Sequence, residues 1–297
     1  MWVTIPRFLY NRLKIKRGIG RALMKLAETR IPLHSLPVTM NDGRVMYLDF
    51  REVMCLPYLL DGEIWGEKGE TTFIKSIVQS QDTVIDIGAN VGWYSSLLSE
   101  IVGSQGRVYG FEPSTKAFSL VEKTAKLYPQ LEINQIALSD FEGEADLHIA
   151  SDGGQSSLQI PLHNITIATQ KCRVTTLDSF LEMKGNPAVS FIKCDAEGAE
   201  LSIVKGASKL LGSEKPPIWM IEILASMMQA FGNSPEELFQ YFEKFRGAKY
   251  EFYWINSQTE EIEPLPKPID FRFDALFVPA WQQDKIMAYN KQRQNIN

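Results

Sequence analysis

The residues best suited to chemistry are two glycines and a carboxylate at the ends of two apolar runs. Residues 88–92 read Gly-Ala-Asn-Val-Gly and follow the β-branched run 84–87, which has the composition of a buried strand. Glu112 follows a second apolar run, 108–111. The glycines permit a tight turn and a close backbone approach, and a carboxylate at the neighbouring strand end can bind both hydroxyls of a ribose. This pattern predicts a nucleoside-bearing cofactor at the carboxyl ends of two adjacent parallel strands.

The loop departs from the dinucleotide-binding fingerprint Gly-x-Gly-x-x-Gly, in which backbone amides at a helix start cradle a pyrophosphate. In this chain Asn90 replaces the second glycine and Trp93 the third, and Trp93 is too bulky for the close helix–strand packing that the third glycine allows. Asp86, in the strand before the loop, would repel a phosphate but attract an ammonium group. S-adenosylmethionine carries an ammonium, a sulfonium and a ribose but no phosphate, so the sequence favours it over a nicotinamide dinucleotide.

Further motifs follow the loop along the chain. They are Phe-Glu-Pro at 111–113, Ala-Leu-Ser-Asp at 137–140, Thr-Leu-Asp at 176–178, Ile-Lys-Cys-Asp-Ala-Glu-Gly-Ala-Glu at 192–200 and the strand-like run 218–223. Together with the loop, this series resembles the FkbM-type S-adenosylmethionine-dependent methyltransferases over about residues 82–224. The loop motif is common to many methyltransferases, whereas the Asp-Ala-Glu-Gly-Ala-Glu run is much more specific.

The resemblance implies a cofactor site on the loop and on the strand ends beside it. The residues expected to surround the methionine part, bind the ribose or lie beside the adenine are Asp86, Gly88, Ala89, Asn90, Gly92, Glu112, Pro113, Ala137 and Asp140. Asp86 would hold the ammonium directly or through water, and Pro113 would stiffen the turn after Glu112. Asp140 could accept a hydrogen bond from the adenine amino group or could form an Asx-turn with the residues that follow it.

Asp195 and Glu197 are the candidate catalytic residues. Asp195 follows the predicted strand 189–194, at the edge of an open α/β sheet where ligands bind, and the resemblance puts it near the transferring methyl group. It could orient the acceptor hydroxyl, take up its proton or contact the cofactor, and Glu197 could assist. A structural alternative makes Asp195 the N-cap of the next helix, with Glu197 in its first turn. We expect Glu200 to support that helix and Glu222 to face the same crevice.

Two histidines are alternative general bases. His148 and His163 flank a polar Gly-Gly-Gln-Ser-Ser stretch, and either could supply a general base near neutral pH. They belong to the long segment 140–175, which interrupts the alternation of strands and helices and contains strand-like runs at 145–150 and 165–174. Because a long loop in a compact domain is more often functional than idle, we expect this segment to cover the methyl acceptor.

The resemblance implies an O-methyltransferase that acts by in-line methyl transfer to a hydroxyl of a sugar, glycan or natural product. The acceptor would be a small molecule or a glycan, and the sequence does not name it. One alternative is a non-catalytic S-adenosylmethionine-binding scaffold that acts through its basic N-terminus. Another, a nicotinamide-dependent oxidoreductase, is disfavoured by the missing glycines.

Composition bounds the other properties. The chain has 297 residues, 44% of them hydrophobic, which is enough for one large α/β domain with additions. No apolar run approaches the roughly 20 residues that cross a bilayer, and no apolar h-region follows the basic N-terminus. Cys55, Cys172 and Cys194 are widely spaced and form no CxxC pair, which indicates reduced thiols and a cytoplasmic protein. Because the three histidines form no cluster with cysteine, we expect no metal site.

Charge is unevenly distributed along the chain, whose net charge is −5. Residues 1–30 hold eight Lys and Arg against Glu28 alone, so the remainder is strongly acidic and is a poor partner for nucleic acid. The basic segment could lie weakly on an anionic membrane surface, or it could be a solvated helix packed against the body or a partner subunit. Neither its role nor the oligomeric state follows from the sequence.

The alternation of strand-like and helix-like segments predicts a doubly wound, mostly parallel α/β sheet. Strands are expected at 83–87, 107–111, 131–137, 189–194, 218–223, 250–255 and 274–278, with an accessory hairpin around the Asn-Asp-Gly turn at 41–43. The resemblance adds the seven-stranded, Rossmann-like topology of class I methyltransferases, with an antiparallel hairpin formed by the last two strands. The expected organisation is a basic N-terminal helical and hairpin extension at 1–62, a methyltransferase domain at 63–285 and a polar tail at 286–297.

Overall fold

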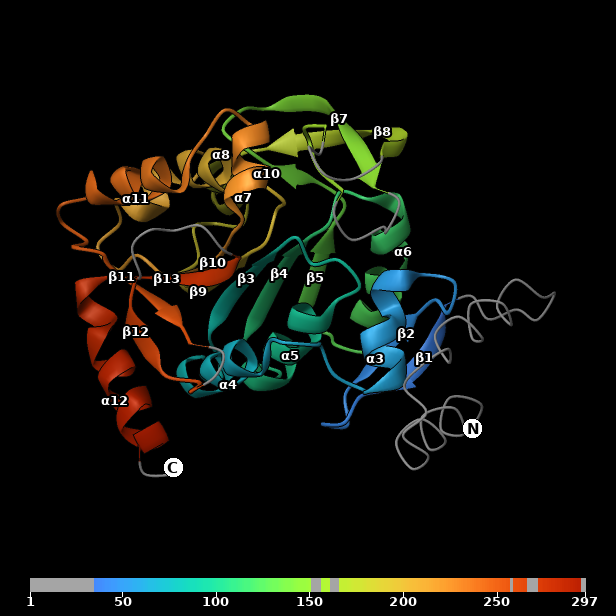
Figure 1. Cartoon of the computed structure of the whole chain (residues 1–297), viewed down its shortest axis with the longest axis horizontal. Helices are drawn as coiled ribbons and strands as arrows, with labels where there is room; N and C mark the ends of the chain where they lie inside the picture. Colours follow the sequence, from blue (N-terminus) through green and yellow to red (C-terminus); the bar gives the residue numbers. More distant parts are fainter. Residues whose placement is uncertain (1–34, 151–155, 161–165, 257–258, 266–271, 295–297) are drawn as a thin grey trace.

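A central β-sheet organises the computed structural model, which describes residues 35–150, 156–160, 166–256, 259–265 and 272–294. Within those residues its strands follow the spatial order β12-β11-β13-β10-β9-β3-β4-β5 (Figure 1). They are β3 (Thr83–Ile87), β4 (Arg107–Phe111), β5 (Leu131–Asn134), β9 (Val189–Cys194), β10 (Ile218–Ile223), β11 (Glu251–Ile255), β12 (Ile262–Pro264) and β13 (Phe273–Val278). Strands β3, β4, β5, β9 and β10 are parallel, and β13 is antiparallel to both β10 and β11.

This arrangement confirms the doubly wound, mostly parallel fold. Strand β3 lies between β9 and β4, so the direction in which the chain adds strands reverses beside β3. The expected hairpin of the last two predicted strands is present as β11 and β13. Strand β12 adds an eighth strand at the edge, which the sequence did not predict because three residues are too few to show alternation.

The third predicted strand differs from the structure. We expected it to span 131–137, but β5 ends at Asn134, and β6 (Ala137–Leu138) pairs in parallel with β8 (Thr166–Thr175) of a separate sheet. Strand β8 also pairs with β7 (Gly143–Ala150), so the sheet has the order β6-β8-β7. The strand-like runs expected at 145–150 and 165–174 are therefore strands, and they pair with each other in an antiparallel hairpin. The hairpin lies at the edge of the molecule, near α8 (Glu200–Lys205) and α10 (Ala225–Ala230) (Figure 1).

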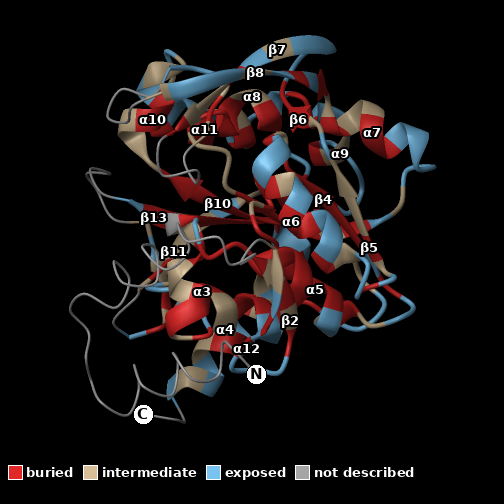
Figure 2. Cartoon of the chain, turned by 90° about the vertical axis from the view of Figure 1, so that its right-hand side faces the viewer, coloured by how far each residue is buried: buried red, intermediate tan, exposed pale blue. Residues whose placement is uncertain are grey.

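Helices cover both faces of the main sheet. They are α4 (Lys68–Ile77), α5 (Trp93–Val102), α6 (Thr115–Ala125), α7 (Leu177–Met183), α8 (Glu200–Lys205), α9 (Ser208–Leu211), α10 (Ala225–Ala230), α11 (Pro235–Glu243) and α12 (Gln283–Gln294). Neighbouring residues of a strand point to opposite faces. Val84 accordingly shares one core with Phe73 of α4 and Leu97 of α5, whereas Ile85 shares the other with Phe180 of α7. In Figure 2 buried residues follow the strands, and exposed residues lie on the outer sides of the helices.

An antiparallel hairpin stands where the Asn-Asp-Gly turn predicts one. Strands β1 (Leu36–Thr39) and β2 (Val45–Leu48) form it, and η1 (Val53–Cys55) and α3 (Leu56–Leu60) follow. The hairpin is tied to α6, because Tyr47 N donates a hydrogen bond of 2.9 Å to Thr124 Oγ1. Met46 and Leu48 belong to the same core as Val84. The boundary that we expect near residue 62 therefore does not separate two cores. Residues 1–34 lie outside the described part.

Most of the expected polar tail belongs to a helix, which reaches the last described residue. Helix α12 follows the short η2 (Ala280–Gln282) and continues to Gln294, so a boundary at residue 286 falls inside it. Only Ile286 and Tyr289 of this helix are buried, which is why its polar sequence gave no amphipathic signal. Asn290 also exchanges two hydrogen bonds with the backbone of Ile262 on β12.

None of the helices in the described residues has the length and apolar character needed to cross a membrane. All three cysteines are buried and free.

Candidate functional site

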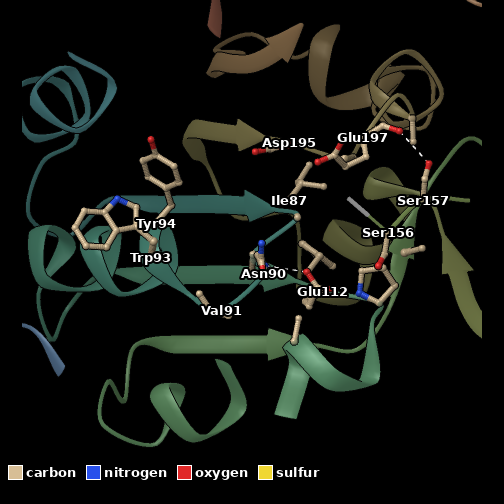
Figure 3. Close-up of a pocket in the computed structure, with 18 of the residues that line it drawn as sticks. Ile87, Asn90, Val91, Trp93, Tyr94, Glu112, Ser156, Ser157, Asp195 and Glu197 are labelled. Atoms are coloured by element: carbon tan, nitrogen blue, oxygen red, sulfur yellow. Dashed lines mark hydrogen bonds between the residues drawn. The ribbon is translucent and has the colours of Figure 1, made fainter. Parts of the chain in front are cut away.

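A pocket of about 350 Å³ lies at the carboxyl ends of β3, β4 and β9 (Figure 3). Its walls come from the glycine loop 88–92, from the residues that follow β4 and β9, from β6, β7 and the described residues 156–158, and from α3 with the segment before α4. This is the edge of a parallel sheet at which open α/β proteins bind ligands.

The glycine loop brings β3 and the segment after β9 into backbone contact. Gly88 has φ +79°, and a Cβ added to it would lie 1.7 Å from the carbonyl oxygen of Asp195. Asp195 N donates a hydrogen bond of 2.9 Å to Ile87 O. At the other end of the loop, Gly92 has φ +94° and a Cβ there would lie 2.8 Å from Val121 of α6. Both glycines are therefore required by the packing of this loop as well as by its turn.

Glu112 is held rigidly at the pocket wall. Its Oε2 accepts a hydrogen bond of 2.8 Å from Asn90 N, and its Oε1 accepts one of 2.8 Å from Ser114 N. Burial raises the pKa of Glu112 to about 7, although these two hydrogen bonds oppose that rise. The structure thus joins Glu112 to the glycine loop through Asn90, as Figure 3 shows. Pro113 and Ala89 line the same pocket.

The end of the pocket beyond Glu112 has an apolar wall, with Ser156 and Ser157 beside it (Figure 3). Ala137 and Leu138 of β6 are buried there, as is Leu147 of β7. The sequence indicated Ala137 but not Leu147, whose position follows only from the pairing of β7 with β8. Asp140 is exposed and does not line the pocket; its Oδ1 accepts a hydrogen bond of 3.3 Å from Ser139 Oγ. The structure therefore does not bring Asp140 to the place that its proposed adenine contact requires.

Asp86 also lies away from the pocket wall. It is 1% exposed, and its Oδ2 accepts a hydrogen bond of 2.5 Å from Ser95 Oγ of α5. Burial raises its pKa to about 6, against the effect of the bond from Ser95. Because side chains alternate along β3, Ile87 contributes to the wall and Asp86 does not. Its carboxylate is bonded to α5, and Asp86 is not among the residues that line the pocket, so it does not contact a ligand there directly.

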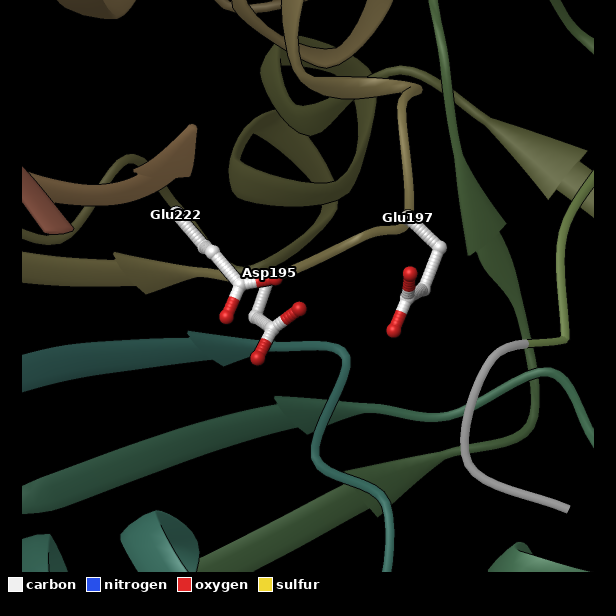
Figure 4. Close-up of side chains that lie close together, drawn as sticks. All are labelled: Asp195, Glu197 and Glu222. Atoms are coloured by element: carbon white, nitrogen blue, oxygen red, sulfur yellow. The ribbon is translucent and has the colours of Figure 1, made fainter. Parts of the chain in front are cut away.

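Three carboxylates come together after β9 and β10 (Figure 4). Oxygen atoms of Asp195, Glu197 and Glu222 lie within 4.8 Å of one another, a spacing that could hold a metal ion but is also common among acidic groups without one. Asp195 and Glu197 line the pocket, and Glu222 is buried at the end of β10. Burial and repulsion by Asp195 raise the pKa of Glu222 well above its ordinary value.

The turn after β9 is not the start of a helix. Glu197 has φ +51°, and α8 begins at Glu200 with Ala199 as its N-cap, so the alternative of Asp195 as N-cap is wrong. Glu200 supports the turn, as expected, because its Oε1 accepts hydrogen bonds from Ala196 N at 3.1 Å and from Gly198 N at 3.0 Å. This arrangement leaves the side chain of Asp195 at the pocket.

Arg272 and Glu67 line the pocket but were not predicted from the sequence. Arg272 donates hydrogen bonds from Nε, at 2.7 Å, and from Nη2 to Glu222 Oε1. It directly precedes β13, and an antiparallel strand starts at the edge where its parallel neighbours end, so this relation could have indicated it. Glu67 precedes α4 and accepts a hydrogen bond from the hydroxyl of Tyr94. No motif marks Glu67.

A buried lysine lies behind this end of the pocket. Lys193 Nζ is 2.8 Å from Asp274 Oδ1 and 3.9 Å from Asp195 Oδ2. Burial by itself would lower the pKa of Lys193. The surrounding carboxylates, among which Asp274 has the largest effect, outweigh burial and raise this pKa well above its ordinary value. The side chain therefore stays cationic and offsets part of the negative charge of the cluster.

Of the two candidate histidines, only His148 belongs to the described residues, and it does not line the pocket. His148 exchanges two backbone hydrogen bonds with Ser157, at 2.8 and 3.0 Å, and is absent from the lining. Ser157 is the residue that reaches the site: its Oγ donates to Glu197 O at 2.9 Å (Figure 3). His163 lies outside the described residues.

The chain is similar to known methyltransferases. The model of the FkbM methyltransferase domain matches residues 86–252, more than half of the chain. The hexuronic acid methyltransferase AglP of Haloferax volcanii is 24% identical over 162 residues, which are 51% of this chain and 63% of that protein. The alignment thus spans less than two thirds of that relative.

Solved methyltransferase structures are also similar. An S-adenosylmethionine-dependent methyltransferase from Aquifex aeolicus has a TM-score of 0.39 and 18% identity, with 71% of this chain and 88% of that chain covered. An O-methyltransferase from Bacillus cereus, in complex with S-adenosylhomocysteine, has a TM-score of 0.38 and 12% identity, with coverages of 93% and 98%. The match over residues 86–252, which include the glycine loop, Glu112 and Asp195, shows that the chain belongs to the FkbM methyltransferase domain family.

Proposed function

We propose that this protein is an S-adenosylmethionine-dependent O-methyltransferase that acts on a hydroxyl of a sugar, a glycan or a natural product. The observation that carries the proposal is the position of Asp195, whose side chain lines the pocket and whose carbonyl oxygen meets Gly88 of the loop. A group bound along the loop would therefore face a carboxylate that can receive an acceptor. Membership of a methyltransferase family supports methyl transfer.

The residues of the pocket fit this cofactor. Glu112 uses two backbone N–H donors to fix its orientation, and an ionised carboxylate has further lone pairs that can accept from ribose hydroxyls. Ala137 and Leu147 offer an apolar wall to an adenine ring. Asn90 Oδ1 is buried, and none of the described residues gives it a hydrogen bond, so a donor on a ligand would satisfy it. Gly88, Ala89, Gly92 and Pro113 would shape the loop around the methionine part and the ribose.

Methyl transfer would require the protein to orient the cofactor and the acceptor hydroxyl and to accept the proton of that hydroxyl. When bound, S-adenosylmethionine supplies a methyl group that its sulfonium has already activated. Orientation of two reactants can lower a barrier by about 7–11 kcal/mol. Asp195, whose side chain is 30% exposed, would orient the acceptor hydroxyl and take its proton onto a carboxylate oxygen, and a positioned base adds about 10²–10⁴-fold. Glu197, on the same wall, would assist.

A sugar is the acceptor class that the comparisons favour. The relative AglP is named for a hexuronic acid substrate. In this chain Asp195, Glu197 and Arg272 give the pocket hydrogen-bonding groups of both charges, which suit a molecule rich in hydroxyls. Strands β6 and β7 would close the adenine end of the pocket, rather than cover the acceptor as the sequence suggested for segment 140–175, and the acceptor would approach beside Arg272.

The proposal is tested by methyl transfer from labelled S-adenosylmethionine into a metabolite and glycan extract, followed by mass spectrometry of the product. The expected result is a labelled O-methyl product with release of S-adenosylhomocysteine. Binding of the cofactor without transfer to any component would instead indicate the non-catalytic scaffold. Tight binding of NAD would contradict the cofactor assignment.

A further inference from the structure

The pocket has two distinct ends, and Glu67 lies at the one opposite the adenine wall. In Figure 3 Glu112 and Ser156 lie to one side of Asn90, and Trp93 and Tyr94 lie to the other. The Tyr94 hydroxyl donates a hydrogen bond to Glu67 Oε2, so Glu67 stands at the Tyr94 end. A cofactor anchored by its ribose at Glu112, with its amino acid part along the loop, would extend toward Tyr94 and Glu67.

The amino acid part of S-adenosylmethionine carries an ammonium group, which requires hydrogen-bond acceptors and favours a carboxylate. Asp86 is buried, is bonded to Ser95 and does not line the pocket. Glu112 belongs to the ribose end. Of the described carboxylates that line the pocket, the remaining ones are Asp195 and Glu197, within the cluster beside Arg272, and Glu67.

The position and the surroundings of Glu67 suit it to bind this ammonium group. The segment before α4 presents it to the pocket, and Tyr94, which is 7% exposed on the first turn of α5, fixes its Oε2. One hydrogen bond leaves an ionised carboxylate with acceptor capacity for a ligand. The nearby cation, Lys193, pairs with Asp274 at 2.8 Å, and within the described residues no Lys or Arg lies within 4.0 Å of Glu67. A ligand ammonium would therefore take a place that no cation of the described residues fills.

We propose that Glu67 binds the ammonium group of the methionine part of S-adenosylmethionine and that Tyr94 is the positioning residue that orients it. This assignment rests on the proposed function, and it replaces Asp86 in the role that the sequence suggested. It joins the segment before α4, far from the family motifs, to the cofactor site.

The test compares ligands with and without the amino acid part, by calorimetric titration of the full chain. S-adenosylhomocysteine has the ammonium, whereas 5′-methylthioadenosine keeps the nucleoside and lacks it. Glu67→Gln should weaken S-adenosylhomocysteine binding by about 10- to 100-fold, as expected for a hydrogen bond between charged groups, and should leave 5′-methylthioadenosine binding within about twofold. Glu67→Asp, which keeps the charge, should retain more affinity for S-adenosylhomocysteine than Glu67→Gln.

Glu63→Gln is the matched control, because Glu63 is an exposed carboxylate four residues earlier in the same segment. It should leave both affinities unchanged. Wild-type affinity of Glu67→Gln for S-adenosylhomocysteine would overturn the assignment, as would an equal loss for both ligands. Loss of turnover with unchanged affinity would also overturn it, since Glu67 would then act in the chemical step. If the wild-type protein binds neither S-adenosylhomocysteine nor S-adenosylmethionine, the proposed function itself fails.

Discussion

The carbonyl oxygen of Asp195 lies so close to Gly88 that a Cβ on Gly88 would come within 1.7 Å of it. The loop that would wrap the cofactor and the segment that carries the candidate base are therefore one packed unit. A change in the loop should therefore disturb the position of Asp195. The distance between the methyl donor and the methyl acceptor would be set by this backbone contact rather than by flexible side chains.

Gly88→Ala should destabilise the protein and abolish cofactor binding. The side chain would overlap a backbone carbonyl, and a φ of +79° costs an L-residue roughly 1–2 kcal/mol by itself, so a loss of about 3 kcal/mol or more is expected in urea unfolding. Gly247→Ala is the control, because no atom lies within 4 Å of a Cβ there. Equal stability of the two variants would contradict the contact between Gly88 and Asp195.

Asp195→Asn should separate binding from chemistry. The amide keeps the shape of the side chain but cannot take a proton, so turnover should fall by about 10²–10⁴-fold while affinity for S-adenosylhomocysteine stays within a few-fold. Labelled methyl transfer and titration measure the two quantities. Unchanged turnover would remove Asp195 as the base.

Glu112→Ala should weaken every ligand that contains the ribose. The change removes the acceptor for the ribose hydroxyls and leaves Asn90 N and Ser114 N without their bonds to this carboxylate. Affinities for S-adenosylhomocysteine and 5′-methylthioadenosine should therefore fall together, by about 10-fold or more. Glu122→Ala, an exposed carboxylate on α6, should change neither. A loss confined to S-adenosylhomocysteine would contradict the ribose role.

Binding of the amino acid part should depend on pH. Burial, followed by repulsion from Asp274 and Asp195, raises the pKa of Glu67 to about 7. Lys193 and the hydrogen bond from Tyr94 oppose this rise. Because the ionised form binds an ammonium, affinity for S-adenosylhomocysteine should fall as the pH drops from 7.5 to 6.

The ratio of that affinity to the affinity for 5′-methylthioadenosine isolates this effect, since Glu112 titrates in the same range and acts on both ligands. In Glu67→Gln the ratio should be independent of pH between 6 and 7.5. A ratio that changes equally in both proteins would assign the titration to another group.

The ligand-free protein should lose stability as the pH rises. Burial raises the pKa of Glu112 and of Glu200 to about 7, and that of Asp86 to about 6, all above their ordinary values near 4. The folded state holds these protons where the unfolded state has released them, so their contribution is complete at low pH and is lost as the pH passes through about 7. Thermal unfolding should show a Tm that falls between pH 5 and 8.

Glu200→Gln should flatten that pH dependence, since an amide cannot titrate and its oxygen can still accept from Ala196 N and Gly198 N. Scanning calorimetry at several pH values measures the slope. A slope as steep as that of the wild-type protein would show that Glu200 does not contribute to it.

Local composition was sufficient for the centre of the sheet. The runs 83–87, 107–111, 189–194 and 218–223 coincide with β3, β4, β9 and β10, because parallel strands buried on both faces are nearly continuous in apolar residues. The glycine loop between β3 and α5 was predictable for the same reason, since a turn that follows such a strand needs residues that tolerate positive φ.

The weakly patterned parts were not predictable to the same extent. Strand β12 is three residues long, and α12 buries only Ile286 and Tyr289, so neither shows a period that a sequence can reveal. The strand-like runs 145–150 and 165–174 could be read from composition, but their pairing could not, because the register of a hairpin depends on contacts between residues as distant in sequence as those of β7 and β8.

By itself, the sequence determined the kind of fold, the family and the backbone of the candidate cofactor loop, all of which depend on neighbouring residues. Only the tertiary structure decided which carboxylates reach the pocket. Asp86 adjoins the loop yet is buried against Ser95, whereas Glu67, outside every motif, reaches the pocket beside Tyr94. Side chains alternate along a strand, and pocket walls form where segments distant in sequence pack together, so proximity in the chain does not decide proximity to a ligand.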